Sequence, residues 1–483
     1  MRTTSGIGTA ALVALMLVGL SSRAQEPISP ATASSSDETS ATATSQPSPQ
    51  VSGYSKVRIV RLSEVKGEVQ LDRQTGKGFE SAMANLPVIE GEKLQTGNGV
   101  AEVEFEDNST VRVAQNSLVE FPRLELLPSG AKASAVNVLQ GTVYVSLVNT
   151  KGNEFTLTAG QQKINLPPDS HIRLQLTQDQ ANLAVMHGEA LVEQPAGSAT
   201  VGKNKTMTFN LAGQSQPVIA KSVAQEPLDS WDNDAVQYHK SYANASSFGN
   251  SPYAYGINDM NYYGSFINAS GCGGSMWRPY FTSASWDPFS SGAWAYYPSA
   301  GYSWVSPYPW GWTPYHYGSW AFCQGTGWGW RPGGSWMGLA NNSFVSSPTS
   351  TTRPRPPSHP PTAFEATLVP VNLKAIPAST LGAHDTFVFR KDSAGFGVPR
   401  GSLGKLNSFS GHAVEHGAAS TNVYWSGGQH SAAESGRSPS ASVSSPSSSS
   451  VSAPSASSYS SGMQSASAGS HASSGASGGS ARH

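Results

Sequence analysis

The sequence has 483 residues, of which 30 are lysine or arginine and 31 are aspartate or glutamate, so its formal net charge is −1. A balance this even excludes the clustered excess of basic residues by which nucleic-acid-binding domains are recognised. Only 13% of the residues are charged, and the 49 glycines and 32 prolines are spread unevenly along the chain. This composition predicts folded regions separated by flexible segments rather than one large globule.

The chain begins with the pattern of an export signal. Arg2 precedes an apolar stretch from Ile7 to Leu20, and small residues stand at Ser22 and Ala24, the positions that a signal peptidase reads. The apolar stretch is shorter than the roughly 20 residues that span a bilayer, which favours a cleaved signal peptide over residues 1–24 rather than an uncleaved anchor. We therefore expect a periplasmic or secreted protein with no transmembrane segment after cleavage.

Several segments offer too few apolar side chains to offset the entropy of ordering. Residues 25–54 consist mainly of Ser, Thr, Ala and Pro and are expected to form a disordered linker. Residues 346–362 are expected to be a Pro-rich spacer, residues 363–425 a weakly structured segment, and residues 426–483 a Ser/Gly/Ala-rich disordered tail.

Residues 55–220 alternate between apolar and polar side chains. In the run from Ala101 to Glu106, for example, Ala, Val and Phe alternate with three glutamates, and similar runs recur through the region. Alternation with a period of two places one face of a strand on a core and the other face in water. Because short runs of this kind are separated by turn-forming residues, we predict an all-β domain, either a short β-solenoid or a sandwich.

A set of motifs stands out within this β region. They are the run from Glu90 to Gly97, the alternating strand after it, the turn at Asp107-Asn108-Ser109, and the segments 139–143 and 155–158. Together they resemble the FecR domain, whose members are extracytoplasmic β domains. The founding member relays a siderophore signal across the inner membrane to a sigma factor. The export signal leads us to expect no cytoplasmic segment that could hold a sigma factor here, so we do not expect the sigma-regulating activity.

Residues 228–345 are rich in Trp, Tyr and Gly. Trp286-x-Pro288 recurs as Trp312-x-Pro314, and Gly292-x-Trp294 recurs as Gly318-x-Trp320. A repeat of about 26 residues marks a repeated supersecondary unit, and we predict that each unit is a β-hairpin with Gly-x-Trp in one strand. Through the strings Trp310-Gly311-Trp312-x-Pro314 and Gly327-Trp328-Gly329-Trp330, the region resembles a Trp/Gly/Tyr-rich domain of unknown function that often follows FecR domains in exported bacterial proteins.

The aromatic residues allow two interpretations. Their rings would form a platform for a carbohydrate or peptidoglycan, or they would build the core of hairpins that are poor in Leu, Ile and Val. Side chains two residues apart share a face of a strand, so Trp310 and Trp312 are predicted to project together, as are Trp328 and Trp330. The candidate ligand contacts are Trp310, Trp312, Tyr315, Tyr317, Trp328 and Trp330.

The two cysteines of the sequence, Cys272 and Cys323, both lie in this aromatic region. In an oxidising compartment two cysteines of one domain usually pair, and the alternative is two free buried thiols. A disulfide between them would tie the first hairpin to the third.

Catalytic and metal-binding motifs are scarce. The one match is His412-x-x-Glu415-His416, the order of an inverted zinc-peptidase motif. That chemistry needs both histidines on one face of a helix and a third ligand, whereas this motif stands between glycines in a Ser/Ala/Gly-rich stretch. For His171 and His187 a structural role is expected. We therefore expect no enzyme, no metal and no cofactor.

These observations predict a non-enzymatic exported protein of the cell envelope with a structural or binding role. Its partner would be a protein or an envelope glycan, and not a nucleic acid. The alternative is a FecR-like extracytoplasmic signalling regulator that lacks the cytoplasmic sigma-binding segment.

Overall fold

The computed structural model describes residues 58–410, except 195–196, 213–214, 249–253, 270–271, 334–335, 342–343, 347–353, 374–391, 405 and 409. The expected signal peptide, linker and Ser-rich tail lie outside these residues. Strands predominate along the described part of the chain, which confirms the all-β prediction. None of the helices in this part combines the length and the apolar character that crossing a membrane requires.

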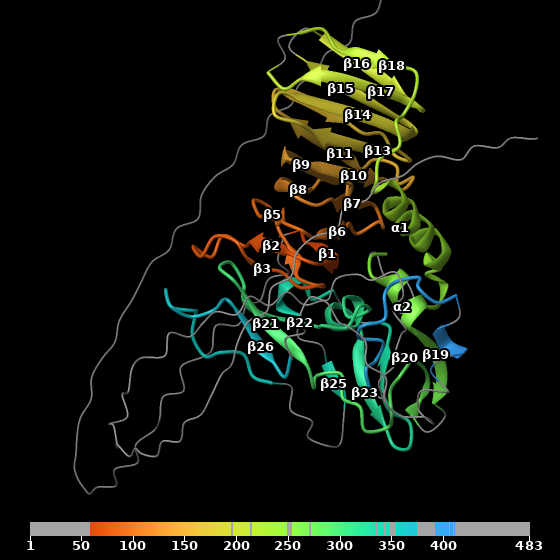
Figure 1. The fold of residues 1–483 in the computed structure, drawn as a ribbon. Coiled ribbons are helices and arrows are strands. Elements are labelled where there is room, and N and C mark those ends of the chain that lie inside the picture. The colour runs from red at the N-terminus through yellow and green to blue at the C-terminus, as the bar shows by residue number, and fades with distance from the viewer. Residues whose placement is uncertain are drawn as a thin grey trace, which may run out of the picture. The chain divides into compact units, whose positions relative to one another are not determined.

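The first part of the fold consists of two nine-stranded sheets, whose strands follow one another in a long stack (Figure 1). The chain changes from one sheet to the other after every one or two strands, and neighbouring strands are antiparallel except β9 and β11. In spatial order, sheet A contains β18 (Val218–Ala220), β17 (Lys205–Asn210), β14 (Gln180–His187), β13 (His171–Leu176), β10 (Thr142–Ser146), β7 (Thr110–Val113), β6 (Val100–Glu104), β1 (Val60–Lys66) and β4 (Pro87–Val88). Sheet B contains β16 (Gly197–Gly202), β15 (Glu189–Gln194), β12 (Gln162–Asn165), β11 (Glu154–Ala159), β9 (Lys132–Gln140), β8 (Leu118–Leu126), β5 (Lys93–Thr96), β2 (Val69–Asp72) and β3 (Glu80–Ser81).

The apolar positions of the alternating pattern form the core of these sheets. Val103 and Val145 of sheet A belong to the same buried cluster as Leu157 and Ile164 of sheet B. The other half of the prediction is wrong for β6. Glu102 and Glu104, which were expected to face water, are 0% and 1% exposed, because the segments that follow the sheets in sequence cover this face.

Helices lead into the aromatic region. Helix α1 (Asp229–Tyr242) lies beside sheet A (Figure 1), and η1 (Ser246–Phe248) and α2 (Ile257–Tyr263) follow it. Within the described residues come three β-hairpins, as predicted from the repeat: β19 (Gly264–Ala269) with β20 (Gly274–Pro279), β21 (Gly292–Tyr297) with β22 (Gly301–Val305), and β23 (Ser319–Cys323) with β24 (Gly327–Arg331). The first and third hairpins share a sheet with β25 (Phe344–Ser346), and the second pairs with β26 (Leu368–Val371). The short helices α3 (Thr313–His316) and η3 (Gly338–Ala340) complete the region.

The glycine that opens each hairpin makes room for the tryptophan of the returning strand. A Cβ on Gly292 would lie 2.1 Å from Cζ2 of Trp304, and a Cβ on Gly264 would lie 2.3 Å from Cζ2 of Trp277. Gly318 stands in the same relation to Trp330, at 2.8 Å. The repeated Gly and Trp of the sequence are therefore one packing unit, used three times.

The segment that was expected to be weakly structured contributes to the fold where it is described. It supplies β26 to the sheet of the second hairpin, and Ala394, Val398 and Leu406 are buried in the aromatic cluster. These residues carry no periodic pattern, and packing against rings of other segments orders them. Residues 411–425 lie outside the described part.

Candidate functional site

The six aromatic residues proposed as ligand contacts are mostly core residues. Exposed fractions are 0% for Trp310, Trp312 and Trp330, 1% for Tyr315 and 2% for Trp328, and Tyr317 is half-buried. A ligand cannot stack on rings that other side chains already cover. The structure thus favours the core interpretation of these residues over the platform interpretation.

Contrary to the prediction, Trp310 and Trp312 do not project together. Trp310 lies in one buried cluster, where its ring stacks on Tyr308 and its Nε1 donates to the carbonyl oxygen of Ala394 at 2.6 Å. Trp312 lies in the other cluster and packs against Tyr255. The prediction assumed a strand, whereas residues 308–312 form a turn ahead of α3. Trp328 and Trp330 do lie on one strand, β24, and share one cluster.

Cys272 and Cys323 form a disulfide, with their Cα atoms 5.7 Å apart. The bond ties the loop between β19 and β20 to the end of β23, so it joins the first and third hairpins as predicted. Because its sulfur is bonded, Cys323 offers no thiol for nucleophilic chemistry.

The zinc-peptidase-like motif at His412, Glu415 and His416 lies outside the described residues. Across the described part of the chain, no group of three or more His, Cys, Asp or Glu side chains is arranged to hold a metal ion. Buried charges are numerous, however, and they pair with one another.

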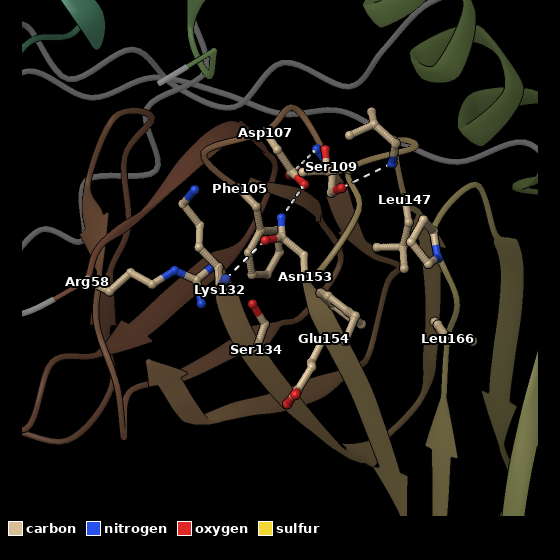
Figure 2. Close-up of a pocket in the computed structure, with 14 residues that line it drawn as sticks. Arg58, Phe105, Asp107, Ser109, Lys132, Ser134, Leu147, Asn153, Glu154 and Leu166 are labelled. Carbon is tan, nitrogen blue, oxygen red and sulfur yellow. Dashed lines mark hydrogen bonds between the residues drawn. The ribbon is translucent and has the colours of Figure 1, made fainter. Parts of the chain in front are cut away.

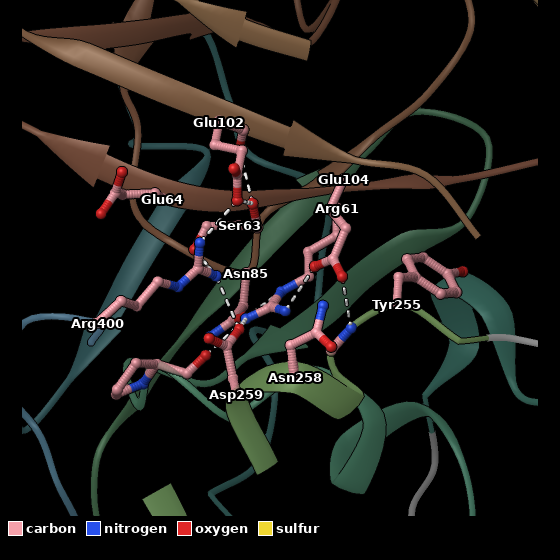
Figure 3. A network of polar contacts seen from close by, with 12 residues as sticks. Arg61, Ser63, Glu64, Asn85, Glu102, Glu104, Tyr255, Asn258, Asp259 and Arg400 are labelled. Carbon is pink, nitrogen blue, oxygen red and sulfur yellow. Dashed lines mark hydrogen bonds and ion pairs between the residues drawn. The ribbon is translucent and has the colours of Figure 1, made fainter. Parts of the chain in front are cut away.

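Arg61 of β1 is the centre of a buried polar network between sheet A and the aromatic region (Figure 3). Its guanidinium is 2.9 Å from the Glu104 carboxylate of β6 and 2.6 Å from the Asp259 carboxylate of α2. It also donates to Asn85 Oδ1 at 2.9 Å, and the amide of Asn85 donates to the carbonyl oxygens of Ser306 and Tyr308. All the charged groups are fully desolvated, so each depends on its partners.

Arg400 extends this network from a segment far along the chain. Its Nη1 is 2.7 Å from Glu102 Oε1, and its Nη2 is 2.7 Å from Asp259 Oδ2 and donates to the carbonyl oxygen of Ser63 at 2.8 Å. Glu102 is shared further with Arg112 of β7, at 2.8 Å, and with His239 of α1, at 3.0 Å. Glu102 therefore links β6 to β7, to helix α1 and to the segment that contains Arg400.

Burial and pairing shift the acidities of these groups in opposite directions. Burial by itself would raise the pKa of Glu102, but His239, Arg112 and Arg400 lower that pKa to well below its usual value. Arg400 and Arg61 likewise outweigh burial and lower the pKa of Asp259. At Glu92, by contrast, burial prevails over a backbone hydrogen bond from Ile89 and the charge of Arg73, and it raises the pKa well above its usual value.

Helix α1 is attached to sheet A by two aspartates of its first turn, where negative charge also favours the helix dipole. Asp229 accepts hydrogen bonds from Tyr144, at 2.9 Å, and from Arg173, at 2.5 Å. Asp232 pairs with Arg112 at 2.8 Å and with His171 at 2.6 Å. The polar faces of β7, β10 and β13 are thus held by the helix that begins the aromatic region.

Two cavities of different size lie near these residues, one within the β-sheet part and one against α1. Figure 2 shows the first, whose volume of about 20 Å³ has room for roughly one water. Its lining groups bond to one another: Asn153 Nδ2 donates to Asp107 at 2.9 Å, and the backbone N–H of Lys132 donates to Asn153 Oδ1 at 2.9 Å. These hydrogen bonds fix the loops around the cavity, whose volume is too small for a ligand larger than water.

The second cavity, which we call the α1 groove, has a volume of about 330 Å³ and lies between the C-terminal half of α1 and the ends of the adjacent sheet A strands. Thr110, Arg112, Leu147 and Val236 form its buried floor, and the exposed Lys240 stands at its rim. Asn149, Asp169, His187 and Ala243 are the other exposed residues along that rim.

The sequences of known families match two parts of this chain. Residues 92–191 match the FecR protein family. Residues 257–354 match a family of unknown function (DUF6600). The two resemblances inferred from the motifs and the aromatic repeat are thereby confirmed. We use the name FecR region for the two-sheet part, residues 60–220, which contains the matched residues 92–191.

Among curated proteins, none matches this chain. Two crystal structures of a candidate anti-sigma factor from Parabacteroides distasonis ATCC 8503 are similar to part of it. The first has 12% identity and a TM-score of 0.24 and aligns with 30% of this chain and 64% of its own, which is less than two thirds. The second has 13% identity and a TM-score of 0.24 and aligns with 32% of this chain and 68% of its own.

Sequence reasoning missed the interface between the FecR region and the aromatic region. A signal existed in the strands themselves, since Arg61 pairs in register with Glu104, and Arg112 with Glu102. Arginines opposite glutamates across a sheet suit desolvated pairing better than lysines would. No local pattern, however, pointed to Arg400.

Proposed function

We propose that this chain is a non-enzymatic binding protein that works outside the cytoplasm. In this proposal the FecR region and the aromatic region act as one unit. The observation that carries the proposal is the network of Arg61, Glu102, Asp259 and Arg400, because breaking ion pairs whose carboxylates are buried opposes independent movement of the two regions. A protein built in this way presents a fixed surface to a partner.

The disulfide supports a location outside the cytoplasm. Disulfides persist in oxidising environments such as the periplasm and the cell exterior, and they are rare in the cytosol. Together with the export signal expected over residues 1–24, the Cys272–Cys323 bond favours a periplasmic or secreted protein. The partner would be an envelope glycan or another envelope protein.

The described side chains that most resemble catalytic groups have structural partners, which supports a role without catalysis. Cys323 is bonded to Cys272, and His316, seven residues before it, is buried with its Nδ1 2.9 Å from the carbonyl oxygen of Gly338. The buried carboxylates Glu102 and Asp259 are occupied by arginines.

The proposal is tested by locating the protein and measuring its retention on the cell wall. Fractionation should recover the protein outside the cytoplasm, and mass spectrometry should find a chain that starts at Gln25. Purified mature protein should then sediment with isolated cell-wall sacculi or with an envelope protein fraction. Recovery in the cytoplasm with Met1 retained, or sedimentation no greater than that of an unrelated periplasmic protein, would contradict the proposal.

A second candidate function is that of a FecR-like signalling regulator. The match of residues 92–191 to the FecR family favours it. A gene for a sigma factor or a TonB-dependent transporter next to this one, and a transcriptional response that is lost when this gene is deleted, would support regulation over a scaffold role.

A further inference from the structure

The α1 groove contains polar groups that the fold itself leaves unused. The hydroxyl of Thr110 is buried, with 1% of the residue exposed, and has no hydrogen-bond partner. Leaving a buried hydroxyl unpaired is unfavourable, and native proteins do it rarely. Its position on the floor of a cavity of about 330 Å³ suggests that a bound molecule completes its hydrogen bonding.

The neighbouring groups are donors as well. Arg112 uses Nε for Glu102 and Nη1 for Asp232, which leaves Nη2 without a partner among the described residues. At the rim, Lys240 forms no ion pair with any described residue, so its ammonium group is available to a ligand.

The acidic groups of the groove, by contrast, are already engaged. Asp107 accepts hydrogen bonds from the backbone N–H of Ser109 on one oxygen and from Asn153 on the other. Asp169 lies 3.1 Å from His187 at the rim. The carboxylates behind the floor, Glu102 and Asp232, are held by arginine and histidine. The groove therefore offers free donors and few free acceptors.

We propose that the α1 groove binds a small organic anion, whose carboxylate or phosphate group is held by Thr110, Arg112 and Lys240. The volume is at the lower end of the range of about 300–1,000 Å³ that small-molecule sites occupy, which suits a ligand the size of a substituted monosaccharide. Leu147 and Val236 supply apolar surface for its carbon skeleton. This inference deepens the proposed binding function by naming a ligand class.

The test uses three matched sugars and the full mature protein. N-acetylmuramic acid carries a carboxylate, N-acetylglucosamine 6-phosphate carries a phosphate, and N-acetylglucosamine is the neutral control. Isothermal titration calorimetry should show that at least one charged sugar binds about ten-fold more tightly than the neutral one, since the charged group gains hydrogen bonds to ionised donors. The preference between the two charged sugars identifies the anion. Equal or absent binding of all three would overturn the proposal.

Two variants with matched controls assign the binding to the groove. Lys240→Gln should weaken binding of the charged sugar by about three-fold or more, while Lys205→Gln, an exposed lysine on β17, should leave it unchanged. Thr110→Val should weaken binding by about ten-fold without lowering the melting temperature, because the hydroxyl that it removes has no partner in the fold. Thr200→Val on β16 is its exposed control.

Charged-sugar binding that survives both Lys240→Gln and Thr110→Val would place the site elsewhere and overturn the assignment. The result is separable from the proposed function, because retention on sacculi is measured with the wall polymer, whereas the groove is tested with free sugars. A protein that is retained on sacculi but binds no charged sugar would refute only the groove.

Discussion

Arg400 offers the most direct test of how the two regions are joined. Replacing it by leucine removes one guanidinium that serves Glu102, Asp259 and the carbonyl oxygen of Ser63. It also removes a cation from above the ring of Tyr238, whose centroid lies 5.7 Å from the guanidinium carbon. The carboxylates stay buried in the variant and lose part of their compensation.

The expected loss of stability follows from the ion pairs that remain in the variant. Breaking a buried ion pair by removing one partner costs about 3–5 kcal/mol, because it leaves a buried charge uncompensated. Glu102 keeps Arg112 and His239, and Asp259 keeps Arg61. We therefore expect Arg400→Leu to lower the free energy of unfolding by about 3 kcal/mol, at the lower end of that range.

Equilibrium urea unfolding, followed by tryptophan fluorescence and far-ultraviolet circular dichroism, measures this change. Arg123→Leu is the matched control, since Arg123 pairs with Glu125 and Glu154 but its side chain is 46% exposed, and its loss should cost about 1 kcal/mol at most. In the double variant Arg400→Leu/Asp259→Asn the costs should not add, because the two groups are in contact. If Arg400→Leu costs no more than Arg123→Leu, the network does not hold the regions together.

Three further predictions concern the hairpins and one buried carboxyl. Cys272→Ser should destabilise the aromatic region by up to about 4 kcal/mol, the chain-entropy value for a bridge with a sequence separation of 51, and labelling of both thiols by alkylation before reduction would contradict the bond. Gly292→Ala should lower the melting temperature because its Cβ would meet the ring of Trp304, whereas Gly202→Ala, with no atom within 4 Å of the new Cβ, should not; equal effects would contradict the packing unit. Glu92→Gln should stabilise the protein at neutral pH, because the raised pKa means that ionisation favours the unfolded chain. The gain in stability should grow by about 1.4 kcal/mol for each pH unit between the unfolded pKa of about 4.3 and the folded pKa, and it should vanish below the unfolded pKa. A variant that is less stable than the parent at pH 7 would contradict this sign.

Much of the fold could be predicted because it depends on short-range rules. Period-two alternation requires strands with one buried face, and it placed Val103 and its neighbours in the core correctly. The recurring Gly-x-Trp predicted the hairpins, because a glycine and a tryptophan at fixed spacing describe one local packing unit. The disulfide followed from two cysteines in one domain of an exported chain.

The candidate site could not be predicted in the same way. The sequence shows that β6 alternates, but it does not show what covers the polar face, and glutamates read as solvent-facing unless their partners are known. Arg400 reaches Glu102 across 298 positions of sequence, and no periodicity extends over such a separation. The α1 groove likewise arises where a helix lies across strands that are distant in sequence. Local pattern thus determined the strands, the hairpins and the disulfide, whereas tertiary structure decided which charges are buried and where a ligand could enter, because desolvation and pairing depend on the segments that meet in space.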